Sequence, residues 1–234
     1  MIIAANLKTN LTRNDTREYI KELQAYMKMK SSMQDVIVFP ATSSLDSFDT
    51  DIKIGAQNAY PVEHGAFTGE IGLEHLNEFG IKTILIGHSE RRHILGESQE
   101  FITQKFDYFK AKGFEIVYCV GEPLKIRERG EEEMLTYIYE QLEGIDTAYE
   151  NLIIAYEPVW AIGTGKVPTL DDIQNIHTKL KEKSDAPLLY GGSVKVNNAK
   201  DILNVENVDG VLVGSAALYV EHFCSMIHSA DELT

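Results

Sequence analysis

Short apolar segments alternate with longer amphipathic segments along the whole chain, which predicts an α/β fold made of repeated βα units. Eight such pairs follow one another over the 234 residues, and no linker or shift in composition interrupts them. Eight evenly spread units favour a closed (β/α)8 barrel over an open doubly wound sheet. A chain of this length with 44% hydrophobic residues can bury one sizeable core, so we expect a single domain over residues 1–234.

Each expected strand is a short apolar run bounded by turn or polar residues. The expected strands are Ile2–Asn6, Val36–Phe39, Ile54–Gln57, Thr83–Ile86, Ile116–Val120, Leu152–Tyr156, Leu188–Tyr190 and Val211–Val213. Amphipathic helical patterns follow most of them, at Thr16–Met29, Ser98–Lys112, Glu131–Glu143, Leu170–Ser184 and Ala216–Ile227. In such a barrel the chemistry lies at the carboxyl ends of the strands, so functional residues are expected there.

Composition excludes several classes of partner. The formal net charge of −14 repels nucleic acid and anionic lipid, so we expect neither as a partner. No apolar run approaches the length of a membrane span, and the chain starts without a charged signal-peptide pattern. Cys119 and Cys224 are too few for a disulfide framework. We therefore expect a cytoplasmic protein.

The first strand ends with Asn6, Leu7 and Lys8. The alternation of a strand puts Asn6 and Lys8 on one side and Leu7 on the other. A lysine is a poor choice for a buried barrel mouth unless an anion meets it. The alternative is that the strand has already ended and Lys8 is solvated.

The segment after the third strand, Asn58–Glu70, is long for a βα connection and apolar for a solvated loop. An exposed Phe67 among small neighbours is better explained by a partner surface than by water. We interpret the segment as an intersubunit loop, and the alternative is a mobile surface loop.

The fourth strand places His88 at the barrel mouth. The run Ser89–Arg92 can start a helical turn whose N–H groups face the imidazole, an environment that disfavours the charged ring. A metal site is not expected, because His88 and His93 do not share a helical face and the chain has no HExxH or cysteine-pair pattern. A lone histidine can also be purely structural.

The sixth strand, Leu152–Tyr156, is an unbroken apolar run, as expected for a parallel strand buried on both faces. Glu157 ends the run, and because Pro158 follows, Glu157 is expected in extended conformation at the carboxyl end of the strand. The alternative is a surface glutamate in a solvent-facing turn.

The segment that follows is apolar in its middle and glycine-rich at its end, which suits a lid over a ligand. Trp160 and Ile162 could exclude water, and the N–H groups of Gly163 and Gly165 could meet an anion. The segment is neither a P-loop nor a dinucleotide fingerprint, because Trp160 and Pro168 stand where those motifs need glycine. Any phosphate site must be of another kind.

The last two strands are followed by small residues that can bind phosphate. Gly191, Gly192 and Ser193 follow the seventh strand, and Gly214 and Ser215 follow the eighth. Barrels of this type hold phosphate with backbone N–H groups at these two positions. The alternative for either pair alone is a set of turn glycines.

Two longer motifs make a family resemblance specific. GHSERR at 87–92 and AYEPVWAIGTGK at 155–166 resemble the triosephosphate isomerase family. Shorter matches run along nearly the whole chain: Asn6 with Lys8, QN at 57–58, GAFTGE at 65–70, CVGE at 119–122 and YGGSV at 190–194.

The resemblance implies a TIM barrel that interconverts dihydroxyacetone phosphate and glyceraldehyde 3-phosphate through an enediolate, in glycolysis and gluconeogenesis. It implies Glu157 as the base, neutral His88 as the donor to the developing oxygen, and Asn6 and Lys8 as sources of positive potential. Glu90 would orient Lys8 or the histidine loop. No metal or organic cofactor is expected.

For substrate binding, the resemblance implies phosphate-binding N–H groups at Gly163, Ser193, Gly214 and Ser215, beside contacts from Asn6 and Lys8. It also implies a homodimer formed through the Gly65–Glu70 loop. Two other functions stay open: a different phosphosugar-binding barrel, and a barrel that binds phosphorylated metabolites without catalysis.

Three positions depart from the pattern that the resemblance leads us to expect. Leu7 replaces a more usual tryptophan, but should point away from the site. Ser215 stands where a second glycine is usual, and its N–H can still donate if the backbone needs no glycine-only conformation. Pro168 lies at the far hinge of the lid, where its fixed φ restricts or defines closure. The chain is also short for the family, so we expect trimmed outer helices, as around Ser43–Phe48.

Overall fold

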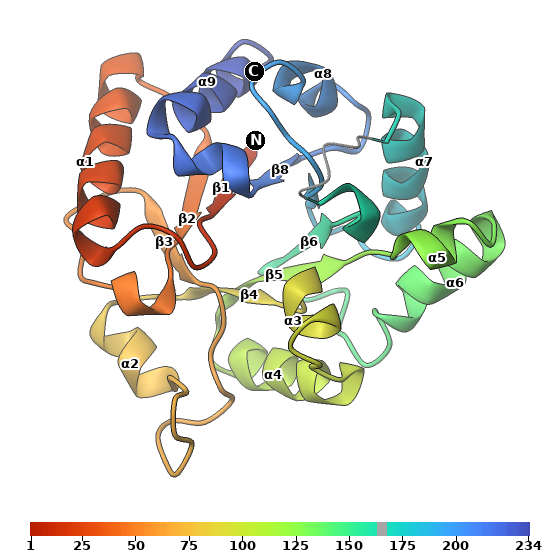
Figure 1. Ribbon diagram of the computed structural model, residues 1–234, viewed down its shortest axis with the longest axis horizontal. Coiled ribbons are helices and arrows are strands. Elements are labelled where there is room, and N and C mark those ends of the chain that lie inside the picture. Colours follow the sequence, from red (N-terminus) through yellow and green to blue (C-terminus); the bar gives the residue numbers. More distant parts are fainter. Residues whose placement is uncertain (163–167) are drawn as a thin grey trace.

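Eight parallel strands close into a barrel in the computed structural model, which describes residues 1–162 and 168–234. The strands are β1 (Ile2–Asn6), β2 (Asp35–Phe39), β3 (Lys53–Ala56), β4 (Thr83–Ile86), β5 (Glu115–Val120), β6 (Leu152–Tyr156), β7 (Leu188–Tyr190) and β8 (Gly210–Val213). Pairing of β1 with both β2 and β8 closes the barrel. Figure 1 shows the strands in the centre with helices around them. The predicted (β/α)8 fold is confirmed.

Four strands differ from the prediction at their ends: β8 begins one residue earlier, at Gly210, and the other three begin with charged residues that a pattern of apolar runs leaves out. Asp35, Lys53 and Glu115 each begin a strand. The Lys53 ammonium lies 2.8 Å from the Asp35 carboxylate and 2.9 Å from that of Glu115, so the charges pair at the amino-terminal edge of the barrel.

Two apolar layers hold the barrel. The inner one fills the barrel and consists of Ala4, Ile37, Phe39, Leu85, Val117, Cys119, Ile153, Ala155, Leu189 and Leu212. The outer one lies between strands and helices and includes Ile3, Ala5 and Leu7. Leu7 is fully buried there, so it points away from the barrel mouth as expected. Each Val, Leu, Ile or Phe side chain among them contributes roughly 1.5–3 kcal/mol through burial.

Helices surround the barrel. They are α1 (Arg13–Lys30), α2 (Leu73–Glu78), α3 (Ser89–His93), α4 (Gln99–Ala111), α5 (Leu124–Arg127), α6 (Glu131–Glu140), α7 (Leu170–Lys181), α8 (Ala199–Leu203) and α9 (Val220–Asp231). Three 3-10 turns, η1 (Thr42–Ser44), η2 (Val159–Ala161) and η3 (Ser215–Leu218), accompany them. As expected for trimmed outer helices, η1 is the one helical turn between β2 and β3 among the described residues.

Several predicted helix limits were wrong. Helix α1 starts before Thr16, because Thr12 caps it in a reciprocal capping box with Asp15. The predicted helix Ala216–Ile227 is two elements, η3 and α9, because Tyr219 between them is extended.

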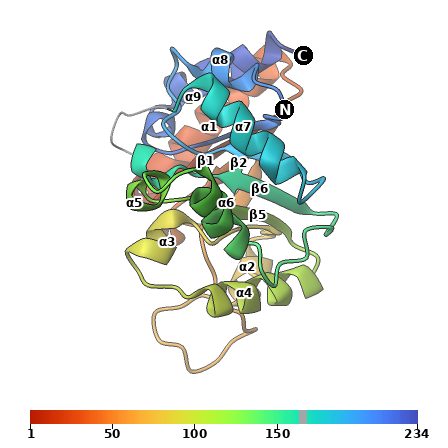
Figure 2. The same cartoon turned by 90° about the vertical axis from the view of Figure 1, so that its right-hand side faces the viewer.

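The connection from β3 to α2 stands out from the barrel as a long loop, visible at the lower edge in both ribbon views (Figures 1 and 2). Residues 63–70 are exposed, and the Phe67 ring stacks on Tyr60 with 4.3 Å between ring centroids. Over the described residues, no helix combines the length and apolar character that crossing a membrane requires.

Candidate active site

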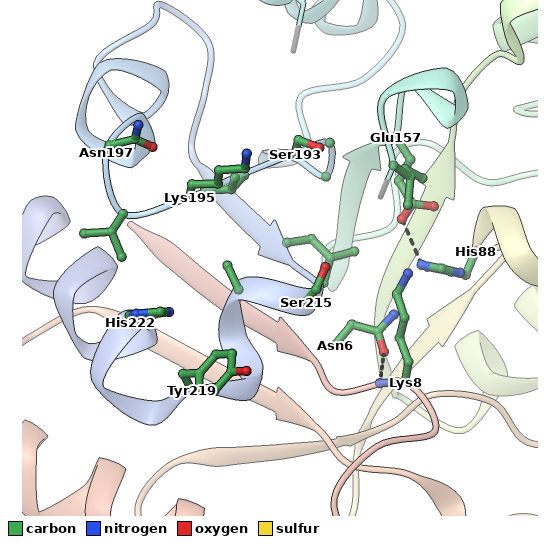
Figure 3. A pocket seen from close by; sticks show the side chains of 18 residues that line it. Asn6, Lys8, His88, Glu157, Ser193, Lys195, Asn197, Ser215, Tyr219 and His222 are labelled. Atoms are coloured by element: carbon green, nitrogen blue, oxygen red, sulfur yellow. Dashed lines mark hydrogen bonds and ion pairs between the residues drawn. The ribbon is translucent and has the colours of Figure 1, made fainter. Parts of the chain in front are cut away.

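The carboxyl ends of the strands surround a cavity of about 670 Å³. Asn6, Lys8, His88, Glu157, Ser193, Gly214 and Ser215 all line it. Figure 3 shows Glu157, His88 and Lys8 gathered at one side, with Ser193 and Ser215 further along. Residues from the ends of β1, β4, β6, β7 and β8 therefore meet in one space, as a (β/α)8 barrel requires of an active site.

Glu157 is a buried carboxylate with partners on both oxygens. It follows β6 directly, and its side chain is 4% exposed. Its Oε1 lies 3.0 Å from His88 Nε2, and its Oε2 accepts the N–H of Ser89 at 3.1 Å. Two donors on one buried carboxylate keep it ionised without bulk water.

Two glycines make room for Glu157. A Cβ at Gly121 would lie 1.8 Å from the carbonyl oxygen of Glu157, and a Cβ at Gly191 would lie 2.9 Å from its Cγ. Both distances are too short for a side chain. The residue after β5 therefore packs against the backbone of Glu157, and the residue after β7 packs against its side chain and limits where the carboxylate can go.

His88 is the N-cap of α3, and its ring receives a backbone donor. Its Nδ1 accepts the N–H of Glu90 at 3.3 Å. In the neutral ring a nitrogen that accepts carries no proton, so Nε2 then holds the ring proton and donates toward Glu157. The predicted helical turn after the fourth strand, with an N–H facing the imidazole, is confirmed.

The direction of the pKa of His88 corrects the expectation that its surroundings disfavour the charged ring. Burial lowers the pKa of His88, but the facing Glu157 carboxylate raises it, and the net pKa lies above its ordinary value. Burial raises the pKa of Glu157, but the His88 ring and the Ser89 N–H lower it by more. The net pKa of this carboxyl therefore lies below its ordinary value. The two side chains stabilise each other's charge.

Lys8 reaches the cavity through an unusual backbone. Its φ is +52°, a left-handed conformation that costs a residue with a side chain roughly 1 kcal/mol or more. Gln57 donates from Nε2 to the Lys8 carbonyl at 2.8 Å and to the Phe39 carbonyl at 2.9 Å, which holds this turn. The Lys8 N–H also donates to Asn6 Oδ1 at 3.0 Å. Neighbouring loops thus aim Lys8 at the cavity.

The ammonium of Lys8 donates to Glu90 Oε1 at 2.6 Å. Its side chain is 24% exposed, so it is neither fully solvated nor fully buried. Glu90 therefore contacts Lys8 through its carboxylate and His88 through its backbone, and so links these two side chains of the cavity.

Backbone donors without an acceptor line the cavity at the ends of β7 and β8. The N–H groups of Ser193, Gly214 and Ser215 meet no acceptor within residues 1–162 and 168–234. Ser193 donates its hydroxyl to the Ala161 carbonyl at 2.6 Å, which ties the segment after β7 to the end of η2. Ser215 begins η3 without a positive φ, so its backbone needs no glycine. The expected N–H group of Gly163 lies outside the described residues.

Glu122 is a buried acceptor that sequence reasoning included only as part of the CVGE match. It is fully buried, and its Oε1 accepts from Trp160 Nε1 at 3.0 Å and from the Tyr156 hydroxyl at 3.2 Å. Burial raises its pKa. Of the two residues expected to exclude water, Ile162 lines the cavity, whereas Trp160 turns its ring nitrogen to Glu122.

Cys119 lies inside the barrel on β5 and is fully buried. Burial raises the pKa of its thiol well above the ordinary value, so the sulfur packs as a small apolar group. No cluster of three His, Cys, Asp or Glu side chains in the described part of the chain has the arrangement of a metal site.

Comparison with known proteins places this chain in a family. The model of the family described as triosephosphate isomerase matches residues 1–230. A triosephosphate isomerase of Sulfurimonas denitrificans is 64% identical over 233 residues, covering 100% of this chain and 97% of that protein. Those of a Sulfurovum and a Nitratiruptor species are 57% and 54% identical, over 97% and 100% of this chain and 99% and 100% of their own. The chain belongs to the triosephosphate isomerase family.

Proposed function

We propose that this protein interconverts dihydroxyacetone phosphate and glyceraldehyde 3-phosphate, as its family membership indicates, with Glu157 moving the proton. One observation carries the assignment of roles: a buried carboxylate and a histidine share a cavity with a lysine and with backbone N–H groups that have no acceptor. The division of roles between base and histidine follows the established pattern of the family rather than a deduction from this chain alone. The reaction is a step of glycolysis and gluconeogenesis.

Glu157 is the base in this proposal. Its carboxylate takes a proton from the carbon next to the substrate carbonyl and returns it to the neighbouring carbon. In the unliganded site the same oxygens are engaged with His88 and the Ser89 N–H. Substrate must come between Glu157 and His88, and a carboxylate released from two donors becomes a stronger base.

His88 is the donor to the enediolate oxygen. The Glu157 carboxylate raises its pKa most, with a smaller contribution from Glu90, and the proposed movement of Glu157 toward substrate weakens the larger influence. Burial and the Lys8 ammonium, which both lower the pKa of His88, then favour the neutral ring. Neutral His88 keeps its proton on Nε2, because Nδ1 still accepts from Glu90, and so it can donate to oxygen. Removing such a donor costs roughly a hundredfold or more in turnover.

Asn6 and Lys8 supply positive potential where negative charge develops, and Glu90 positions Lys8. The phosphate group binds at the N–H groups of Ser193, Gly214 and Ser215, and the N–H of Gly163 completes this set in our proposal. The substrate's own carbonyl acidifies the proton, so the scheme uses no metal or organic cofactor.

We also propose a homodimer through the Gly65–Glu70 loop. The loop extends away from the barrel, and Phe67 keeps 39% of its surface exposed while stacking on Tyr60. An ordered, exposed aromatic residue of this kind fits a protein partner. A monomeric mass by sedimentation at micromolar concentration, together with full activity, would refute the dimer. We assign the protein to the cytoplasm, in keeping with its free, buried Cys119 and Cys224.

The decisive experiment is turnover of glyceraldehyde 3-phosphate by the purified protein beside its Glu157→Gln variant. We expect fast conversion by the wild-type protein and a loss of at least about a thousandfold in the variant, because glutamine cannot take a proton. Unchanged thermal unfolding of the variant serves as the control for folding. Equal turnover in both proteins would refute the role of Glu157, and no turnover in either would refute the function.

A further inference from the structure

The active-site cavity does not end at the proposed phosphate site. Beyond Ser193 and Ser215 it is also lined by Lys195 and Asn197, from the segment between β7 and α8, and by His222 near the start of α9. Figure 3 shows Ser193 and Ser215 between these residues and the pair formed by Glu157 and His88. The cavity therefore has an outer end that the proposed reaction does not use.

The outer end has room for a ligand larger than the substrate. The whole cavity measures about 670 Å³, which falls in the range of roughly 300–1,000 Å³ that drug-sized ligands occupy. A triose phosphate is among the smallest sugar phosphates and spans only the distance from the catalytic groups to the phosphate site. A longer molecule bound by the same phosphate site would place its far end beside Lys195 and His222.

The chemistry of this outer end favours an anion. The chain carries a net charge of −14, yet Glu157, at the opposite end, is the one carboxylate among the described residues that line the cavity. Lys195 is exposed and forms no ion pair in the described part of the chain, whereas Lys8, Lys53 and Lys105 are each paired with a carboxylate. An unpaired ammonium in a pocket without nearby carboxylate is a ready partner for a phosphate group.

Three further polar side chains line the outer end of the cavity together with Lys195 (Figure 3). His222 and Asn197 offer ring and amide N–H donors, and Tyr219 offers a hydroxyl. The Tyr219 and His222 rings lie 5.2 Å apart between centroids, so they form one wall. The backbone beneath Lys195 is also held, because its N–H donates to Asn198 Oδ1 at 2.7 Å and Asn198 donates to the Ser193 carbonyl at 3.1 Å. Lys195 is thus fixed at its base to the segment that carries Ser193.

We propose that Lys195, His222, Asn197 and Tyr219 form a second anion subsite, which takes the far phosphate of a linear sugar bisphosphate. The near phosphate binds the N–H groups of Ser193, Gly214 and Ser215, so this inference rests on the phosphate site of the proposed function. A bisphosphate held at both ends occupies the site without presenting a carbon acid to Glu157. It therefore inhibits competitively and couples the enzyme to the supply of larger phosphorylated sugars.

The test compares linear alkanediol bisphosphates of increasing chain length with the monophosphates of the same alkanediols. Binding is measured by calorimetry and by inhibition of glyceraldehyde 3-phosphate turnover, at one fixed ionic strength. In the wild-type protein, the best bisphosphate should bind at least about tenfold more tightly than its matched monophosphate, since one added charge-assisted contact is worth about that factor.

Two variants locate the effect. Lys195→Ala should reduce the bisphosphate advantage to about twofold or less, while turnover of glyceraldehyde 3-phosphate stays within about twofold of wild type. Lys125→Ala is the matched control, because Lys125 is an exposed lysine on α5 that does not line the cavity. It removes the same charge and should leave the advantage intact.

The outcomes separate the two proposals. A bisphosphate advantage that is absent at every chain length, or that persists in Lys195→Ala, overturns the second subsite even when turnover is normal. An advantage lost equally in Lys125→Ala also overturns it, because general electrostatic attraction then accounts for the binding. Absent turnover overturns the proposed reaction, and calorimetry still decides whether Lys195 holds the second phosphate.

Discussion

Two buried histidines in this molecule respond to burial in opposite ways. His88, at the barrel mouth, is 6% exposed, and His177 of α7, between helix and barrel, is fully buried. Burial lowers the pKa of His177 to about 4, whereas the pKa of His88 lies above its ordinary value. The difference is the partner: His88 faces the Glu157 carboxylate, while His177 donates from Nδ1 to the Asn207 carbonyl and its Nε2 meets no acceptor or donor among the described residues.

The comparison shows that depth of burial does not decide charge in this fold. Removal from water favours the neutral ring at both positions. At the barrel mouth, a carboxylate from another strand outweighs that effect and keeps a pair of charges out of bulk water. In the outer layer a backbone carbonyl is too weak to do so, and the histidine stays neutral. A functional site of this kind therefore differs from the core by its charge partners.

The largest of these effects on stability should come from protonation of His177 as the pH falls. Its pKa is depressed from 6.5 to about 4, so its contribution to stability is present above about pH 6.5 and is lost as the pH falls toward 4. The loss amounts to about 3 kcal/mol of unfolding free energy. In His177→Asn, which keeps a donor near Asn207 but cannot be protonated, this pH dependence should disappear.

Urea unfolding of both proteins at pH 7.5 and at pH 5, at one protein concentration, checks this prediction. The variant loses ring volume and should be less stable at pH 7.5, but the gap between the two proteins should narrow at pH 5. Parallel pH profiles would mean that folding does not lower the pKa of His177 and would contradict the prediction.

The next effect concerns the geometry of the charged pair. A Cβ at Gly191 would lie 2.9 Å from Glu157 Cγ, so Gly191→Ala must displace the carboxylate by a few tenths of an ångström. A displacement of about 1 Å can cost on the order of a hundredfold, and we expect a fall of about tenfold in kcat with KM changed by less than about twofold. Steady-state kinetics measures both constants, and thermal unfolding controls for folding. A kcat within twofold of wild type would show that the base has more freedom than the packing implies.

A smaller effect is expected at His88, where the contribution to stability should change with pH in the direction opposite to that of His177. The pKa of His88 is raised, so its stabilising contribution is complete below about pH 6.5 and is lost as the pH rises through the folded-state pKa. The stability difference between wild type and His88→Gln should therefore shrink from pH 6 to pH 9 in the unliganded protein. It should be smaller than the His177 effect, because burial opposes the Glu157 carboxylate at His88. A difference that grows over this range would contradict the ion pair between His88 and Glu157.

The sequence predicted the barrel well because apolar runs end where the strands end. Tyr156 closes β6 and Glu157 follows it, so both the strand and the place of the carboxylate could be predicted. Its contact with His88 could not, since these residues come from different strands and no local pattern encodes their distance. The same limit explains why the predicted direction of the His88 pKa shift was wrong. The helical turn beside His88 can be predicted from the sequence, whereas the Glu157 carboxylate faces it only in the closed barrel.

The candidate site divides in the same way. The glycines and serines after β7 and β8 were predictable from their position at strand ends. The presence of Lys195 and His222 in one cavity was not, because one follows β7 and the other lies on α9, and neither belongs to a motif. Glu122 was named only within CVGE, and its role as acceptor for Trp160 depends on the loops that fold over β5 and β6.

The smallest effect is expected at Ser215, where the chain departs from the family pattern. Its backbone N–H meets no acceptor among the described residues, and its φ is not positive, so a glycine would present the same donor in the same place. Ser215→Gly should change KM for glyceraldehyde 3-phosphate by less than about twofold, because the N–H rather than the side chain meets the phosphate. The added backbone freedom should cost at most about 1 kcal/mol of stability. A KM lowered by more than about fivefold would instead show that the serine hydroxyl obstructs phosphate binding. The anion would then lie closer to η3 than binding by the backbone N–H groups alone requires.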